Sequence, residues 1–361
     1  MFDPKFSPNG ATILTGESYG QLKLWTTNGE LIRTVDAYDI RRRLSDFALS
    51  PDGQVIASTS RSGPVAQLWN TEGKLLNVLD GHEGESTSFV AFSPDGQILA
   101  TTRNDIIRLW TLDGELLHTL TNDADYISKI AFSPDSKILA SANGTNGTVK
   151  LWSTEGKLLR TLGNRGEYTD LAFSPDGKYL AAANADNTLQ LWDAKGELIH
   201  SLEGHTGPLV RVRFTPDSQT IGSTGLDGTI RLWTLDGELL QTFGSSDERM
   251  GRFAFSPDGK LMATESESIG DHTIKLWSIE GELLQTLVGH RDSIFELAFS
   301  PDSKTLVSGS ADETAILWDL EALEFDALMQ RGCEWWREYT EYQDIPPDPQ
   351  REICDGLHKE G

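Results

Sequence analysis

One sequence pattern recurs eight times along this chain at almost even spacing. Each copy has a turn related to Phe-Ser-Pro-Asp-Gly, then a short apolar segment, and it ends on a Leu-Trp pair. Consecutive pairs are about 42 residues apart. The tryptophans that mark the copies are Trp25, Trp69, Trp110, Trp152, Trp192, Trp233, Trp277 and Trp318.

A period of this length is typical of one four-stranded propeller blade. In the last copy, residues 294–300 alternate as a strand, residues 301–303 form a turn, and 305–309 and 314–318 are two further strands. Proline and aspartate in the turn favour a tight reversal of the chain. Other copies continue into a fourth strand, such as 282–287. The expected fold class is therefore all-β, a β-propeller of eight sequence repeats.

These repeats resemble the WD-repeat family over residues 1–319. The resemblance implies a buried tetrad in each blade, made of a histidine, a serine or threonine, a turn aspartate and the tryptophan. A third blade offers His82, Thr101 or Thr102, Asp105 and Trp110, whereas the fifth copy has Ala182 in place of the serine and lacks the histidine. Two copies match in full, with His205, Ser223, Asp227 and Trp233, and with His290, Ser308, Asp312 and Trp318.

We interpret these Ser, His and Asp sets as structural, because they recur once per blade. Catalysis would need a nucleophile, a base and an oxyanion donor outside the repeat register, and the sequence offers no such set. Calcium-loop and phosphate-loop spacings are also absent from the sequence. We therefore expect no enzyme activity, no metal and no cofactor. The alternatives are a propeller enzyme with a central-channel site and a purely architectural ring.

The charge and the cysteine content restrict partners and location. A net charge of −24 argues against nucleic acid, whose binding depends on neutralising phosphates. No apolar run approaches the roughly 18 residues that span a membrane, and no secretory signal is visible at the start. Two cysteines make no disulfide framework, which favours a cytoplasmic location.

Recognition is expected where the repeats differ, because loops on a rigid scaffold carry binding residues. Positions four and six before each turn phenylalanine share one face of the inner strand, and the family resemblance implies contacts there at the channel mouth. Arginine and aromatic residues are typical of interaction hot spots. They predict a protein or peptide partner, with an acidic segment favoured, although ordinary solvated loops are the alternative. The candidates are Arg43, Tyr126, Arg249 and Phe295, with Arg41, Arg42, Arg165, Arg252 and Arg291 nearby.

The sequence allows two ways of closing the ring, which differ in the blade that the strand at residues 30–35 completes. Residues 30–35 read as a complete fourth strand, whereas the last repeat ends at Asp319 without one. The favoured register uses residues 30–35 to complete the last blade, so that residues 1–29 are a partial first repeat and residues 30–319 form seven blades. The rival is an eight-bladed ring whose last blade has three strands.

Residues 320–361 form a tail with a different composition. An apolar stripe over 320–342 predicts an amphipathic helix, and a second short helix follows the Pro346-Pro347 bend. The tail is similar to those that close the propeller arrays of cyanobacterial-type bacterial WD-repeat signalling proteins. That similarity implies a sensor or scaffold role for the chain. Cys333 and Cys354 would approach if the helices pair, but free thiols are favoured.

Overall fold

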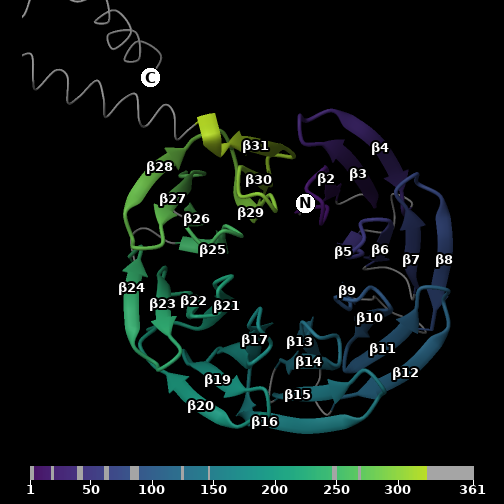
Figure 1. Cartoon of the computed structure of the whole chain (residues 1–361), viewed down its shortest axis with the longest axis horizontal. Helices are drawn as coiled ribbons and strands as arrows, with labels where there is room; N and C mark the ends of the chain where they lie inside the picture. Colours follow the sequence, from purple (N-terminus) through teal and green to yellow (C-terminus); the bar gives the residue numbers. More distant parts are fainter. Residues whose placement is uncertain are drawn as a thin grey trace, which may run out of the picture.

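The computed structural model describes residues 4–17, 20–38, 44–60, 65–81, 89–122, 126–144, 147–245, 250–266 and 270–322. Within these residues, the strands form eight antiparallel sheets that follow one another around a ring (Figure 1). The first strand of each sheet lies on the inside of the ring and the fourth on the outside. The all-β propeller fold is therefore confirmed, with eight blades.

The blades are numbered 1 to 8 in chain order, and each uses its strands in sequence order. Blades 1 to 4 consist of β1 (Lys5–Phe6), β2 (Thr12–Gly16), β3 (Gln21–Thr26) and β4 (Leu31–Asp36); β5 (Leu44–Leu49), β6 (Val55–Ser60), β7 (Val65–Asn70) and β8 (Leu75–Asp80); β9 (Val90–Phe92), β10 (Ile98–Arg103), β11 (Ile106–Thr111) and β12 (Leu116–Thr121); and β13 (Ile127–Phe132), β14 (Ile138–Asn143), β15 (Gly147–Ser153) and β16 (Leu158–Gly166).

Blades 5 to 8 consist of β17 (Tyr168–Phe173), β18 (Tyr179–Asn184), β19 (Leu189–Asp193) and β20 (Leu198–Leu202); β21 (Leu209–Phe214), β22 (Thr220–Gly225), β23 (Ile230–Thr234) and β24 (Leu239–Phe243); β25 (Met250–Phe255), β26 (Leu261–Ser266), β27 (Ile274–Ser278) and β28 (Leu283–Leu287); and β29 (Ile294–Phe299), β30 (Thr305–Ser310) and β31 (Ala315–Asp319).

The recurring Ser-Pro-Asp turn is held by its own side chains. In blade 8, Ser300 Oγ donates to Asp302 Oδ1 at 2.6 Å and accepts the Thr305 N–H at 2.9 Å. Ser303 has a φ of 64°, the left-handed conformation that glycine takes at the same place in blade 7, where Gly259 has a φ of 73°. These contacts reverse the chain between the first two strands of the blade.

The hydrophobic core consists of layers between neighbouring blades. One layer joins Leu202 of blade 5 to Val212 and Trp233 of blade 6, and another joins Leu287 of blade 7 to Leu297 of blade 8. Seven such clusters are found within the described residues, one at each junction from blade 1 through blade 8. Blades 2 to 7 are thus covered on both faces by their neighbours, which explains why their second strands are buried along almost their whole length.

The seven-bladed register is wrong. Strand β4 pairs with β3 of its own repeat, from Gln21 opposite Asp36 to Trp25 opposite Leu31. The short turn between these strands is closed by the Thr26 N–H bond to the Glu30 carbonyl, at 2.8 Å, and this bond returns the chain directly onto β3. Blade 8 therefore keeps only three strands.

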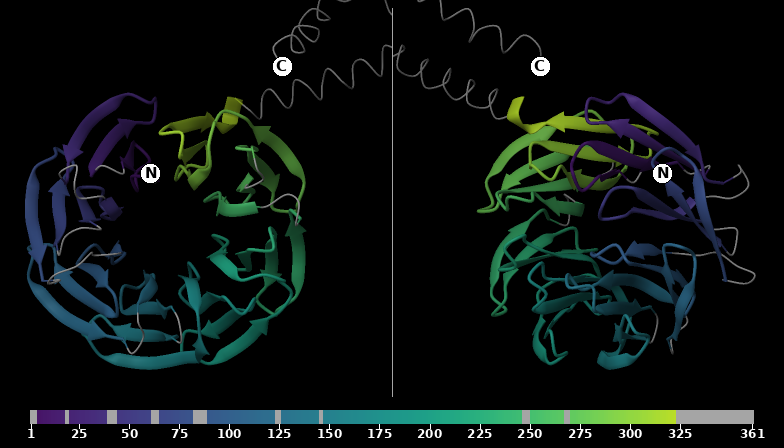
Figure 2. Two further views of the ribbon diagram at one scale, coloured as in Figure 1. Left: turned by 180° about the vertical axis from the view of Figure 1, so that it is seen from behind. Right: turned by 45° about the vertical axis from the view of Figure 1, so that its right-hand side comes forward.

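Blades 1 and 8 lie side by side and complete the ring (Figure 2). A Cβ built on Gly10 of blade 1 would be 3.2 Å from the Pro301 ring of blade 8. The same turn contact joins Gly53 of blade 2 to Pro8 of blade 1, at 3.6 Å. The chain turns helical at residues 320–322. The rest of the predicted helical tail, with Cys333 and Cys354, lies outside the described residues.

Candidate interaction surface

The structure brings each of the two complete tetrads together. In blade 6, His205 Nδ1 is 2.9 Å from Asp227 Oδ2, and His205 Nε2 is 2.9 Å from Ser223 Oγ. The Trp233 indole N–H donates to the same Ser223 oxygen at 2.9 Å.

In blade 8, the distances from His290 to Asp312 and Ser308 are 3.0 and 2.7 Å, and Trp318 Nε1 lies 2.9 Å from Ser308. Each set links the second and third strands of one blade, and the turn between them, to the loop that enters the blade.

The direction of these hydrogen bonds follows from the chemistry of the groups. Burial lowers the pKa of His205, against the opposing pull of the Asp227 carboxylate, and this favours the neutral ring. Burial opposes ionisation of Asp227 as well, but hydrogen bonds from Thr206 and Thr229 hold its pKa below the ordinary value. An ionised carboxylate only accepts, so Nδ1 carries the ring hydrogen and Nε2 accepts from Ser223. Since Ser223 is 0% exposed, its hydroxyl is structural and inaccessible to a substrate.

Other blades replace the histidine with residues that sequence reasoning missed. In blade 2, the Tyr38 hydroxyl donates to the Ser58 carbonyl at 2.9 Å. Tyr38 follows Val35 by three residues, the same spacing by which His205 follows Leu202, so its position carried the signal. In blade 5, the buried Tyr168 hydroxyl donates to Gln190 at 2.8 Å, and burial raises its pKa to about 12.

Blade 3 uses Thr101 rather than Thr102, because the Trp110 indole donates to Thr101 Oγ1 at 2.8 Å. His82 lies outside the described residues.

The rim at the start of the inner strands is described in part. Tyr126 is 41% exposed, and its ring covers Gly144, where a Cβ would collide with it. Arg291 is exposed, and its backbone N–H donates to Asp312 at 2.9 Å. Four predicted residues, Arg41, Arg42, Arg43 and Arg249, lie outside the described residues, as does the side chain of Arg165.

Several positions predicted to face a partner instead connect neighbouring blades. Ser128 Oγ donates to the Tyr168 carbonyl, and Thr169 Oγ1 donates to the Leu209 carbonyl at 2.8 Å. Arg252 shows the same behaviour with a longer side chain. Its guanidinium bonds the Ile294 carbonyl at 3.3 Å and Glu265 at 3.2 Å, and it lies 5.9 Å from the Phe295 ring centre. Arg252 thus holds Phe295 in place at the rim.

Below the rim, paired charges line the central channel. Arg211 of β21 forms two hydrogen bonds with Glu296 of β29, at 2.9 and 2.8 Å, and so spans from blade 6 to blade 8. Burial opposes ionisation of Glu296, but Arg211 holds its pKa below the ordinary value. Arg213 pairs with Asp170 at 2.7 Å. Lys5, Lys129, Arg211 and Glu296 are among the residues that line a cavity of about 440 Å³ here.

Sequence reasoning missed this charged channel, although one signal was present. Arg213 immediately precedes the turn phenylalanine of blade 6, where the inner strands of the other seven repeats have other residues. Alanine takes that place in blades 2, 3, 4, 5, 7 and 8, as Ala48, Ala91, Ala131, Ala172, Ala254 and Ala298. Arg213, at a position where six other blades have alanine, indicates that the side chains lining the channel differ from blade to blade.

No group of three or more His, Cys, Asp or Glu side chains suited to a metal occurs in the described parts of the chain. The helical content of those parts includes no segment long and apolar enough to cross a membrane.

A ring of four-stranded antiparallel blades with Trp-Ser-His-Asp networks defines a WD-repeat propeller. The chain belongs to the family described as WD domain, G-beta repeat, whose sequence profile matches residues 73–111, 114–153, 156–193, 196–234, 237–278 and 281–319. It is 28% identical over 156 residues to the small ribosomal subunit protein RACK1y of Oryza sativa subsp. japonica. That match covers 40% of this chain and 45% of the relative, so it spans less than half the length of the relative.

Among solved structures, the chain is similar to the C-terminal WD40 domain of Sif2. The TM-score is 0.75 at 20% identity, and the superposition covers 87% of this chain and 94% of that domain. At this identity the likeness concerns the fold alone.

Proposed function

We propose that this chain is a non-catalytic platform for protein–protein interaction. WD-repeat propellers typically bind proteins, and the buried serines and histidines here are committed to hydrogen bonds within their blades. The observation that carries the proposal is the rim, where Tyr126 is exposed and Phe295 is braced by Arg252. Aromatic side chains that are held rigidly lose little entropy on binding.

The partner that fits this rim is a protein or peptide with an acidic segment. Arg291 is exposed at the rim, and the sequence places Arg41, Arg42, Arg43, Arg165 and Arg249 in the same set of loops. Local positive charge on a chain of net charge −24 would steer an acidic segment to this face. We further propose, from the similarity of its tail, that the chain is the sensor or scaffold part of a cytoplasmic bacterial signalling protein.

The test uses an array of Asp- and Glu-rich peptides, with Lys-rich peptides of the same length as controls. The double variant Arg43→Glu/Arg249→Glu should weaken binding of the acidic peptides at least tenfold and leave the melting temperature unchanged. A matched control is Lys178→Glu/Lys260→Glu, which makes the same charge change in exposed turns on the opposite rim. Stronger loss in the control variant would show that the assigned face is wrong.

A further inference from the structure

The inner strands present two levels of side chains to the central channel. Side chains alternate along a strand, so the first and third residues before each turn phenylalanine share one face. The residue between them is buried in the layers between blades, as Ile130, Val212 and Leu297 are. Strands β13, β21 and β29 border the centre of the ring (Figure 1). The first and third positions therefore form the channel wall and decide what the channel can bind.

Charged residues occupy the third position in blades 2, 4, 5, 6, 7 and 8, counted from Leu49 in blade 2. Most of these charges are neutralised by a partner of opposite sign on the same wall or on the strand behind it. The pairs are Arg211 with Glu296, Arg213 with Asp170, Lys5 with Asp46, and Arg252 with Glu265.

Lys129 of β13 is the exception to this pairing. It is half-buried, lines the cavity of about 440 Å³, and forms neither an ion pair nor a hydrogen bond with the described part of the chain. The acids that line the same cavity are already engaged. Both oxygens of Glu296 bond Arg211, and Asp46 accepts the Val90 N–H at 3.0 Å. Lys129 therefore places an uncompensated positive charge on the channel wall.

The cavity is thus positive although the whole chain has a net charge of −24. Four bases and two acids line it, and Asp170, which pairs with Arg213, reduces the excess to the single charge of Lys129. A partly buried charge is screened less than an exposed one, so an anion gains more here than on the surface. Within the described structure, both hydrogen bonds of Arg213 use Nη1, which leaves Nε and Nη2 as further donors.

A second cavity, of about 470 Å³, adjoins the first on the side of the Ser-Pro-Asp turns. Arg213 and Glu296 line both cavities, so the two spaces meet at these side chains. The other walls of the second cavity are apolar and include three turn prolines. Aromatic walls of this kind favour a flat apolar ligand. The rings that contribute are Phe214, Phe253, Phe255 and Phe299.

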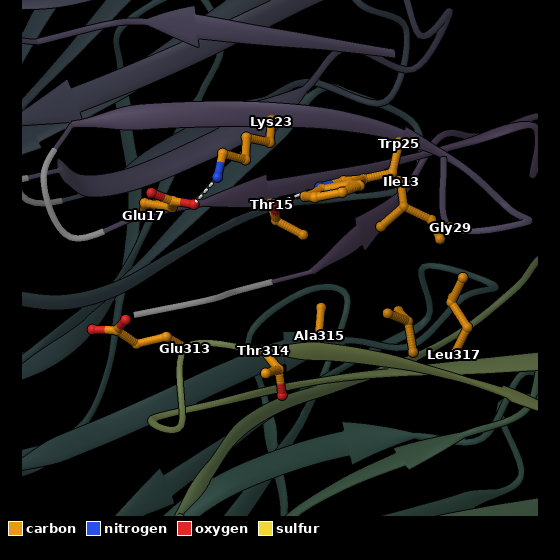
Figure 3. Close-up of a pocket in the computed structure, with 11 residues that line it drawn as sticks. Ile13, Thr15, Glu17, Lys23, Trp25, Gly29, Glu313, Thr314, Ala315 and Leu317 are labelled. Atoms are coloured by element: carbon orange, nitrogen blue, oxygen red, sulfur yellow. Dashed lines mark hydrogen bonds and ion pairs between the residues drawn. The ribbon is translucent and has the colours of Figure 1, made fainter. Parts of the chain in front are cut away.

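The cavity at the outer junction between blades 8 and 1 offers no comparable cation. It has a volume of about 290 Å³, with Trp25 on the wall of blade 1 and Leu317 on the wall of β31 (Figure 3). Its one lysine, Lys23, is already paired with Glu17 (Figure 3). The central channel, by contrast, combines an unpaired lysine with an adjoining aromatic cavity.

We propose that the central channel binds a small organic anion that carries a carboxylate or phosphate group on a flat apolar body. The acidic group pairs with Lys129 in the charged cavity, and the apolar body reaches past Arg213 into the aromatic cavity. Each cavity has a volume within the range of about 300–1,000 Å³ that is usual for ligand sites. The site opens toward the turns rather than the rim, so it is separate from the proposed surface for a protein partner.

The test compares probes that share one naphthalene ring, by isothermal titration calorimetry with the full chain. Naphthoate and naphthyl phosphate should bind saturably, and the tighter of the two identifies the preferred acidic group. Neutral naphthamide should bind at least tenfold more weakly than naphthoate, because it lacks the charge. Inorganic phosphate should bind at least tenfold more weakly than naphthyl phosphate, because it lacks the apolar body.

Lys129→Gln should weaken binding of both anionic probes at least tenfold and leave the melting temperature unchanged, because this lysine has no partner to lose in the described structure. Lys157→Gln is the matched control. It makes the same charge change in the same blade, at a side chain that is 76% exposed on an outer turn. The control should bind both probes as the unmodified chain does.

Three results would overturn the proposal. They are the absence of saturable binding, naphthamide binding as tightly as naphthoate, and naphthyl phosphate binding that survives Lys129→Gln. The double variant Arg43→Glu/Arg249→Glu should bind naphthyl phosphate normally, which separates a failure of this site from a failure of the rim. Displacement of naphthyl phosphate by the acidic peptides would show that the channel belongs to a peptide-binding surface, and this result would also overturn the proposal.

Discussion

At the scale of single residues, the tetrad of blade 6 combines a neutral histidine with an ionised aspartate. His205 donates to Asp227 and accepts from Ser223, so protonation of Nε2 would reverse the direction of the hydrogen bond to the serine. The same side chains in an open cleft would suggest hydrolysis. Here their burial and their repetition in blade 8 make them supports of the sheet.

Protonation of His205 should make stability depend on pH. Because burial lowers its folded-state pKa below the ordinary 6.5, the unfolded chain takes up this proton more readily than the folded chain. The contribution is fully present above pH 6.5 and is lost as the pH falls below it. Urea midpoints measured from pH 7.5 to 5 should decline, and His205→Leu should reduce the slope. An equal slope in both proteins would contradict the assignment.

Replacing the tryptophan should lower the free energy of unfolding by different amounts in the two complete tetrads. Trp233 is buried, and Trp233→Ala should lower the free energy of unfolding by about 3–5 kcal/mol. Trp318 is half-buried because no fourth strand covers blade 8, so Trp318→Ala should cost less. Chemical denaturation of both variants gives the comparison. A larger loss for Trp318→Ala would mean that blade 8 is covered in solution.

At the scale of strands, the sequence alone predicts the turns and the alternation of each strand, because these depend on residues close together in the chain. The turn at Ser300–Pro301–Asp302 and the alternation of β29 depend on neighbouring residues, and both were predictable. Ring closure was not, because β4 has the same pattern whether it pairs with β3 or with β31. Pairing with β3 prevails because a short turn costs little loop-closure entropy. The Arg211–Glu296 pair joins residues 85 apart in sequence, and only the ring brings them together.

This ion pair should couple the inner strands β21 and β29. Glu296→Ala leaves the Arg211 guanidinium without its main carboxylate partner in a partly buried channel. The loss in unfolding free energy should be below the roughly 3–5 kcal/mol typical of fully buried pairs, because both side chains retain some exposure. Arg211→Met combined with Glu296→Leu should recover most of the loss. Additive losses in this double variant would show that the two residues act separately.

At the scale of the whole molecule, the ring is continuous at its turns and open at its outer seam. Gly10 and Pro301 bring blades 1 and 8 together at one rim, as Gly53 and Pro8 do for blades 1 and 2. On the outside, the cavity beside Trp25 separates the same two blades. Within the described residues, the junction between blades 8 and 1 is therefore the one without a buried apolar layer.

Deleting residues 1–29 tests the eight-bladed ring as a whole. The deletion removes β1, β2 and β3, so β4 loses its pairing partner and the layer that joins Leu14 and Leu22 to Phe47 is lost. The melting temperature should fall, and blade 2 should become the new exposed end. A control deletion of residues 343–361, in the tail beyond the described residues, should leave the melting temperature unchanged. If deletion of 1–29 also left it unchanged, blades 2 to 8 would form a closed ring by themselves, and the eight-bladed ring would not be the folding unit.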